Sequence, residues 1–197
     1  MVTRQPGPGD GPQLLALTSL AGWRQFASEV PAVPGLLDSG TWQDLDPGKR
    51  AAYDDDRIAH HSRLLVVQTP AVRDVVTTGR RLANMNRSAH YGRSGLIVSG
   101  PARTGKTTAI TQLGKTIEVI HRWRYPGCGG DIPVVYITVA PAATPRMIAA
   151  EFARFLGIPV TRQANITDII EAVCGVCTDT KVTAVCVDFT DRYFPCS

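Results

Sequence analysis

The chain has 197 residues, of which 44% are hydrophobic and 19% are charged, and this composition excludes a disordered or collagen-like chain. Its 21 basic and 17 acidic side chains leave a net charge of +4, which is too small to indicate a nucleic-acid partner by itself. No apolar run reaches the roughly 18 residues that a membrane span needs, and no secretory signal is evident. We therefore expect a cytoplasmic protein that does not bind membranes.

The sequence predicts three regions of different character. Residues 1–12 are rich in proline and glycine and are predicted to form a disordered tail. Residues 13–63 show short helical periodicities interrupted by prolines, which indicates a helical N-terminal extension. Residues 64–197 alternate between strand-like and helix-like segments, as expected for an α/β core.

Positive charge is concentrated in residues 57–93, which contain seven arginines and a single acid, Asp74. Part of this segment has the spacing of an amphipathic helix, with Arg73, Arg80 and Arg81 on its polar side. Because seven residues are about two helical turns, Arg73 and Arg80 lie on one stripe, with Arg81 beside it. The stripe is either a solvated helix face or a surface for the phosphates of double-stranded DNA.

The order of elements after this helix predicts the fold class. Apolar and β-branched runs predict strands, and Thr144 and Asn165 are expected to cap the two later helices, the first of which Gly157 ends. Strands and helices alternate along the chain, which is typical of parallel crossovers. We predict a three-layer α/β domain with a parallel sheet, built from strand 95–99, helix 106–123, strand 134–139, helix 145–156, helix 166–177 and strand 182–187.

The segment GPARTGKT, residues 100–107, fits the phosphate-binding pattern GxxxxGK[ST] between a predicted strand and a predicted helix. Its glycines allow the backbone to curl around a phosphate, and Lys106 supplies a charge for the β- and γ-phosphates of ATP. An ordinary glycine-rich turn is the alternative, but such a turn has no use for the Lys-Thr pair. The residues predicted to bind nucleotide are Gly100, Arg103, Thr104, Gly105, Lys106, Thr107 and Thr108.

An acid is expected at the end of another buried strand, where it holds Mg²⁺ through its water shell. The run AVCVD ends at Asp188, so we assign Thr107 and Asp188 to the metal. The next residue is Phe189, where hydrolysing members of this class usually carry a glutamate that polarises water. Asp191 is a weak substitute, and we assign no catalytic residue.

The chain ends nine residues after Asp188. This leaves no room for the later strands and arginines that a hydrolysing P-loop domain typically uses, so we expect incomplete hydrolysis machinery. Cys174 and Cys177 form a lone C-x-x-C pair within a helical pattern. We expect both to be small buried side chains rather than zinc or redox groups.

Residues 134–147, VVYITVAPAATPRM, and residues 151–157, EFARFLG, resemble the TniB-type ATP-binding proteins of transposons, which are AAA+ ATPases. The resemblance covers about residues 40–188, including the phosphate loop and the strand that ends at Asp188. It implies an ATP-binding regulator of transposition that forms homo-oligomers on DNA. The implied partners are a DDE-type transposase and a target-selection protein.

The sequence departs from this family after Asp188, where DFTDR stands in place of the expected DEIHN. The resemblance therefore implies ATP and Mg²⁺ binding by a member that is truncated or frameshifted and impaired in hydrolysis. Two alternatives remain open. The chain is an active AAA+ ATPase of another process that a partner chain completes, or it is a non-functional remnant.

Overall fold

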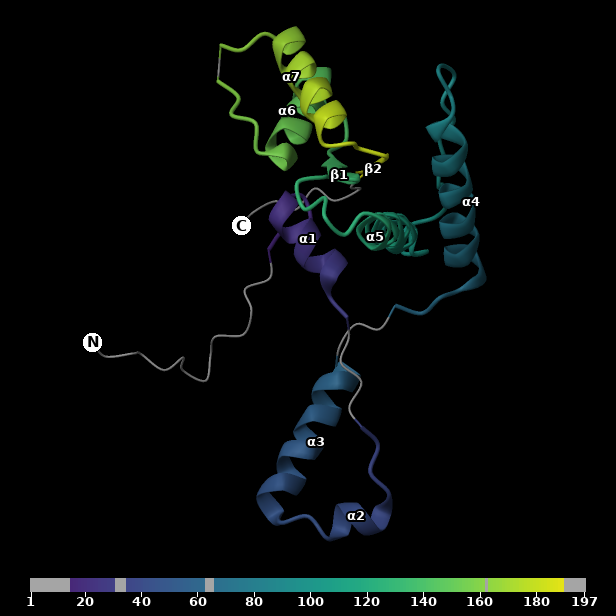
Figure 1. The fold of residues 1–197 in the computed structure, drawn as a ribbon, viewed down its shortest axis with the longest axis vertical. Coiled ribbons are helices and arrows are strands. Elements are labelled where there is room, and N and C mark those ends of the chain that lie inside the picture. The colour runs from purple at the N-terminus through teal and green to yellow at the C-terminus, as the bar shows by residue number, and fades with distance from the viewer. Residues whose placement is uncertain (1–14, 31–34, 63–65, 162, 190–197) are drawn as a thin grey trace, which may run out of the picture. The chain divides into compact units, whose positions relative to one another are not determined.

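The computed structural model describes residues 15–30, 35–62, 66–161 and 163–189, so the predicted tail and Asp191 lie outside the described residues. The described residues form, in chain order, α1 (Leu20–Ser28), α2 (Ser39–Gln43), α3 (Pro47–Ser62), α4 (Pro70–Arg87), α5 (Lys106–Arg124), β1 (Val134–Val139), α6 (Pro145–Leu156), α7 (Ile166–Asp179) and β2 (Ala184–Phe189) (Figure 1). They divide into two compact units. The smaller unit is Glu29–Thr69, and the larger one contains all the other elements.

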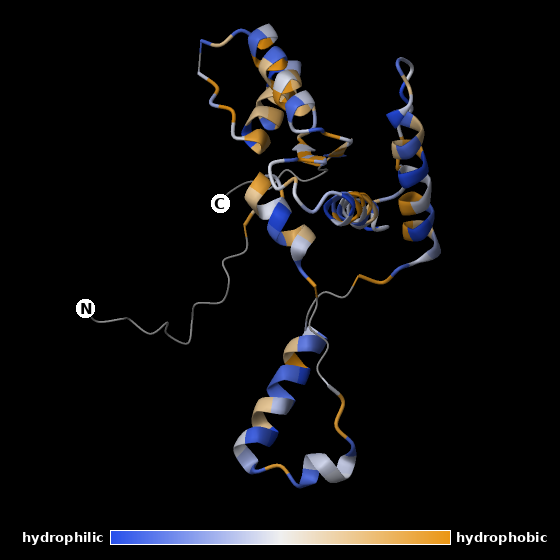
Figure 2. Cartoon of the chain, viewed as in Figure 1, coloured by the Kyte–Doolittle hydropathy of each residue, from blue (hydrophilic) through white to orange (hydrophobic). Residues whose placement is uncertain are grey.

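The smaller unit contains α2 and α3; in Figure 2 much of α3 is hydrophilic, and α2 has colours near the middle of the hydropathy scale. Neither helix buries a residue. The two helices are joined by contacts of Trp42, whose indole Nε1 donates to Asp54 Oδ1 at 3.3 Å. The guanidinium of Arg50 lies over the same ring, 4.5 Å from its centre. With so little apolar surface removed from water, this unit has no hydrophobic core among its described residues.

The larger unit is built around a parallel pair of strands, β1 and β2, which are hydrophobic in Figure 2. Val134 lies opposite Ala184, and the register continues to Val139 opposite Phe189. Nearly all of β1 is buried, as its run of β-branched residues predicts. Even-numbered side chains of both strands share one face, because side chains alternate along a strand and the register pairs even with even numbers.

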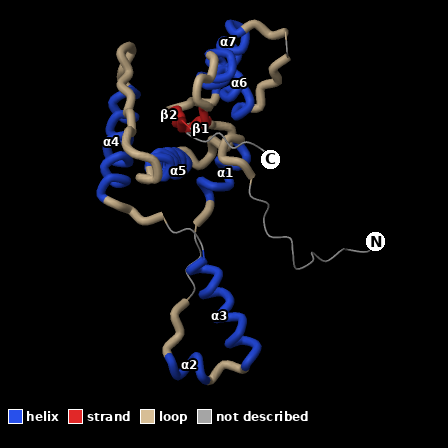
Figure 3. Tube along the Cα trace, turned by 180° about the vertical axis from the view of Figure 1, so that it is seen from behind, coloured by secondary structure: helices blue, strands red, loops and turns tan. Residues whose placement is uncertain are grey.

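Helix α5 covers the even-numbered face and runs antiparallel to the strands. Cys186 Sγ lies 3.9 Å from the Ile110 carbonyl oxygen, whereas a Cβ at Gly114 would meet the side chain of Val134. Gly114 therefore lies near the beginning of the strands, and Ile110, one turn closer to the start of α5, lies further along them. The start of α5 is thus at the carboxyl ends of the strands. Helix α4 packs beside α5, as Figures 1 and 3 show.

Helices α6 and α7 lie on the other side of the sheet from α5 (Figure 1). Both helices begin where the sequence predicts and α6 ends there too, whereas α7 continues two residues beyond its predicted end, to Asp179. Thr144 Oγ1 accepts a hydrogen bond from the Met147 amide at 3.3 Å, Gly157 ends α6 with φ of 72°, and Asn165 caps α7. The layered α/β arrangement of helices on both faces of a parallel sheet is thus present, with two strands in the described residues.

Trp23 of α1 is the largest of the fully buried side chains of this unit, with none of its surface exposed. Its ring stacks on Tyr136 of β1 with 5.5 Å between centroids and an interplanar angle of 13°. Its Nε1 donates to Glu118 Oε2 of α5 at 3.3 Å. A Cβ at Gly114 would lie only 2.6 Å from the indole, so the missing side chain at Gly114 lets the ring lie against α5.

The prediction of a buried strand at residues 95–99 is wrong. The segment is extended but unpaired within the described residues, and Ile97 is 91% exposed. Asn86, in the last turn of α4, accepts from the Ser94 amide at 2.9 Å and donates to the Ser94 carbonyl at 2.8 Å, which ties the segment to α4. A groove of about 200 Å³ separates it from β2. An apolar run forms a strand only where a neighbouring backbone completes its ladder.

Two smaller predictions also need correction. Cys174 is exposed and Cys177 is only partly buried, so they are not the pair of buried side chains that the helical pattern predicted. Both are free thiols. The last strand begins and ends two residues later than predicted, at Ala184 and Phe189.

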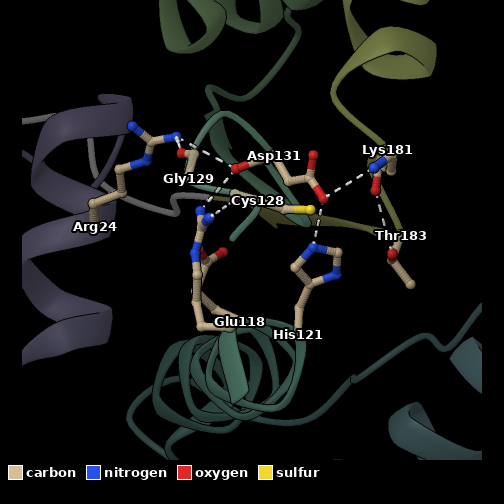
Figure 4. Close-up of polar contacts among 9 residues, drawn as sticks. Arg24, Glu118, His121, Cys128, Gly129, Asp131, Lys181 and Thr183 are labelled. Carbon is tan, nitrogen blue, oxygen red and sulfur yellow. Dashed lines mark hydrogen bonds and ion pairs between the residues drawn. The ribbon is translucent and has the colours of Figure 1, made fainter. Parts of the chain in front are cut away.

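A polar cluster fixes the loop that connects α5 to β1 (Figure 4). Asp131 Oδ2 lies 2.9 Å from His121 Nε2 and 3.5 Å from Lys181 Nζ. Arg122 donates to the Cys128 and Asp131 carbonyls, and Arg24 of α1 donates to the Asp131 carbonyl as well. The hydrogen bond from His121, aided by the Lys181 charge, lowers the pKa of Asp131 below its ordinary value.

We predict that Gly114→Ala destabilises the protein by about 1–3 kcal/mol, because the new methyl group collides with the fixed ring of Trp23. Gly175→Ala is the matched control, since it also replaces a helical glycine but meets nothing within 4 Å. The free energy of unfolding of this control should rise by up to about 1 kcal/mol, because alanine has a higher helix propensity than glycine. Urea unfolding measures both, and equal shifts would contradict the packing described for Trp23.

We predict that Asp131→Asn lowers the melting temperature at neutral pH and that the difference from wild type shrinks in acid. A carboxyl whose folded pKa is lowered adds stability above its unfolded pKa of about 3.9, and this stability is lost as pH falls through the folded pKa. Asp74→Asn, at an exposed position of α4, is the control. A difference that stays constant from pH 7 to pH 3 would contradict this role of Asp131.

Candidate functional site

The predicted phosphate loop leads directly into α5, and its backbone has the required curvature. Gly105 is the residue before the helix and has φ of 85°, a left-handed conformation that glycine adopts without strain. Arg103 has φ of 65°, which is uncommon for a residue with a side chain and is typical of strained functional loops. No side chain caps the start of α5, so its first amides have no side-chain acceptor.

Lys106 holds the loop together from the first position of the helix. Its ammonium donates to the carbonyl of Gly100 at 2.9 Å and to that of Pro101 at 2.7 Å. The hydroxyl of Thr104 also donates to Pro101, at 2.9 Å. The charge of Lys106 is thereby held against the backbone of the loop, where a phosphate oxygen could replace these carbonyls as its partner.

Thr107 and Thr108 form the first turn of α5 together with Lys106. Thr107 is exposed and Thr108 is half-buried. Their carbonyls accept hydrogen bonds from the hydroxyl of Thr111, at 2.9 Å and 3.0 Å. The exposed hydroxyl of Thr107 is therefore placed at the helix start, beside the positive end of the helix dipole.

Asp188 lies near the carboxyl end of β2, opposite Thr138. It is 9% exposed, and its Oδ2 accepts a hydrogen bond from the Tyr136 hydroxyl at 3.1 Å. The following residue, Phe189, is 71% exposed and has no group that can take a proton. The side chain of Asp188 shares the even-numbered face of the sheet with Tyr136 and Cys186, the face that α5 covers.

The direction of α5 brings these predicted residues toward one another. Gly114 is level with Val134, and Ile110 is level with Cys186 and hence with Tyr136. One further turn back along the antiparallel helix reaches Lys106 at the level of Asp188. The phosphate loop and the acid therefore lie at the same end of the sheet, the carboxyl end, where α/β folds bind their ligands.

The donor set suits Mg²⁺ rather than a metal held by the protein alone. Within the described residues no group of three or more His, Cys, Asp or Glu side chains could hold an ion. Mg²⁺ is usually bound through one or two carboxylates together with substrate phosphates and water. A single carboxylate at Asp188 and the hydroxyl of Thr107 fit that pattern.

Tyr136 is the site residue that sequence reasoning missed. Its hydroxyl contacts Asp188, and burial, followed by the nearby charge of Asp188, raises its pKa well above the ordinary value of 10. The sequence signal for it is a tyrosine in the strand that pairs with the strand of Asp188. Because side chains alternate along a strand, this tyrosine shares a face with the acid. Reading it required the register between β1 and β2, which the sequence does not give.

The predicted phosphate loop at the start of α5 and an acid near the end of a parallel strand are consistent with the α/β fold of P-loop nucleotide-binding ATPases. The family described as AAA domain matches residues 89–192, which is more than half of the chain, so the chain belongs to the AAA domain family. Members of this family generally bind ATP with Mg²⁺. Comparisons with curated proteins and with solved structures found no match. Within the part of the chain that the structure describes, no helix is long and apolar enough to cross a bilayer.

Proposed function

We propose that the chain binds ATP and Mg²⁺ between the phosphate loop and Asp188. The observation that carries this proposal is the uncapped start of α5, with Lys106 folded over the loop, at the same end of the sheet as Asp188. Uncapped amides, a helix dipole and an ammonium together form an anion site. The same groups in an ordinary turn would have no reason to lie at the end of the sheet where a buried acid stands.

In this proposal different residues bind the phosphates and the metal. The amides of residues 103–108 surround the β-phosphate, and Lys106 exchanges its bonds to the loop carbonyls for bonds to phosphate oxygens. Thr107 and Asp188 would hold the metal, the hydroxyl directly and the carboxylate through water. The metal itself neutralises charge on the β- and γ-phosphates.

We further propose that the chain acts in DNA transposition in the manner of TniB-type proteins, as a homo-oligomer with DNA, a DDE-type transposase and a target-selection protein. The resemblance of residues 134–157 to those proteins supports this proposal. So does the position of Arg73, Arg80 and Arg81, which are all exposed on α4. A different side of the helix, at Val72 and Gly79, is buried.

We predict that Lys106→Ala weakens the binding of a fluorescent ATP analogue by roughly 2–4 kcal/mol, the range for losing one partner of a close charge pair. Lys49→Ala removes an exposed lysine of the smaller unit and is the charge-matched control. Circular dichroism checks that both variants are folded. Equal affinity of wild type and Lys106→Ala would refute the assignment of the phosphate loop.

We predict that ATP turnover is absent or very slow, because Phe189 follows Asp188 where a base would orient the attacking water. A positioned base is typically worth about 10²–10⁴ in rate. Phosphate release, measured with and without DNA, tests this, and Phe189→Glu shows whether a carboxylate at this position is sufficient. Turnover near ~1 per second by the wild type would mean that another group acts as base.

We predict that DNA binding is independent of DNA sequence and weakens steeply with salt. A plot of the logarithm of the binding constant against the logarithm of the salt concentration should fall with a slope of about 0.9 per neutralised phosphate. Replacing Arg80 and Arg81 by Ala should lower that slope by up to about two units and leave nucleotide affinity without DNA unchanged. Arg154→Ala, on α6, is the control. A slope equal to that of the wild type would show that this side of α4 does not contact DNA.

A further inference from the structure

A side-chain hydrogen bond connects the acid of the site to the interior of the protein. The Tyr136 hydroxyl lies 3.1 Å from Asp188 Oδ2. Tyr136 is 3% exposed and Asp188 is 9% exposed, so both groups are largely removed from water. A buried carboxylate that accepts a hydrogen bond from a fixed donor loses much of its freedom to rotate about the bond to its Cβ.

The Tyr136 hydroxyl is the donor in this bond. A phenol ordinarily keeps its proton at neutral pH, because its usual pKa is about 10. A carboxylate can only accept, and the hydroxyl therefore donates to Asp188. The two oxygens of Asp188 are thus made unequal, since Oδ2 is held by Tyr136 and Oδ1 is the one left for a ligand.

Tyr136 is in turn held by α1. Its ring stacks on the fully buried ring of Trp23, 5.5 Å away, and Trp23 is fixed by the close approach to Gly114 and the bond from its Nε1 to Glu118. Glu118 is held by two bonds from Arg122, at 3.0 Å and 2.9 Å. A continuous chain of contacts therefore extends from α1 and α5 to the carboxylate.

We propose that Tyr136 is a positioning residue that orients the Asp188 carboxylate toward Mg²⁺, and that Trp23 of α1 holds Tyr136 in the orientation this requires. The proposal rests on the nucleotide-binding function proposed above. In this proposal α1 influences the orientation of the metal-binding carboxylate, although α1 precedes the phosphate loop by about 80 residues in the sequence. It predicts that the hydroxyl of Tyr136 matters for the metal-dependent part of nucleotide affinity and not for the metal-independent part.

The test is the affinity for a fluorescent ATP analogue, measured with Mg²⁺ and with EDTA. The ratio of the two affinities is the metal gain. Tyr136→Phe, which removes only the hydroxyl, should lower the metal gain by about three- to tenfold, the range expected for one hydrogen bond, and leave the EDTA affinity within about twofold of wild type. Tyr125→Phe is the matched control, because that ring lies at the far end of α5 against His121.

A double-mutant cycle separates positioning from a general effect on stability. Asp188→Asn should lower the metal gain by more than Tyr136→Phe does, and adding Tyr136→Phe to it should lower the gain no further. An additive loss, an equal loss in EDTA, or an unchanged or larger metal gain in Tyr136→Phe would overturn the positioning role. If wild type and Lys106→Ala bind the analogue equally, the nucleotide site itself fails and the positioning role fails with it.

A second measurement keeps Tyr136 intact in case its substitution impairs folding. With Trp42 and Trp123 replaced by Phe, Trp23 is the remaining tryptophan and its emission reports on the ring stacked against Tyr136. Adding Mg²⁺ to the nucleotide-bound protein should change this emission, and the change should be lost in Asp188→Asn. Emission that does not respond to Mg²⁺, or that responds equally in Asp188→Asn, would overturn the coupling between α1 and Asp188.

Discussion

The stacking of Trp23 between α5 and β1 is the contact on which the larger unit depends. It joins three segments that are far apart in the sequence, since α1 supplies the ring, Gly114 of α5 supplies the space and Tyr136 of β1 supplies the opposing aromatic face. A fully buried tryptophan removes a large apolar surface from water and fixes the distance between helix and strand. Because Tyr136 also binds Asp188, the same contact that stabilises the core sets the position of the acid.

The site follows from this packing and from the direction of α5. A helix antiparallel to parallel strands places its positive end at their carboxyl ends, where β2 ends near Asp188. Lys106 closes the loop before the helix by donating hydrogen bonds to the carbonyls of Gly100 and Pro101. Positive and negative groups are thus held at one end of the sheet, which is the requirement for binding a metal–nucleotide complex.

Local chemistry in the sequence predicted the features that depend on neighbouring residues. Thr144, Gly157 and Asn165 mark helix ends because caps act within one helical turn, and the β-branched run of β1 forms a strand over the predicted residues. The phosphate loop was likewise predictable, because its glycines and Lys106 act within eight residues.

Features that depend on distant partners could not be predicted in this way. Residues 95–99 have the composition of a buried strand but are exposed, because Asn86 holds the neighbouring Ser94 and no described strand pairs with them. Cys174 fits a helical pattern, yet its side of α7 is exposed. The bond between Tyr136 and Asp188 depends on strand register, which no local pattern encodes.

Hydrogen–deuterium exchange with and without ATP and Mg²⁺ is the most direct test of nucleotide binding by this chain. We predict slower exchange of the amides of residues 103–108 when the nucleotide is present, because these amides would then donate to phosphate oxygens. Lys106→Ala should lose this protection, while the amides of α3 exchange equally in both states. Unchanged exchange at residues 103–108 under saturating nucleotide would contradict the account.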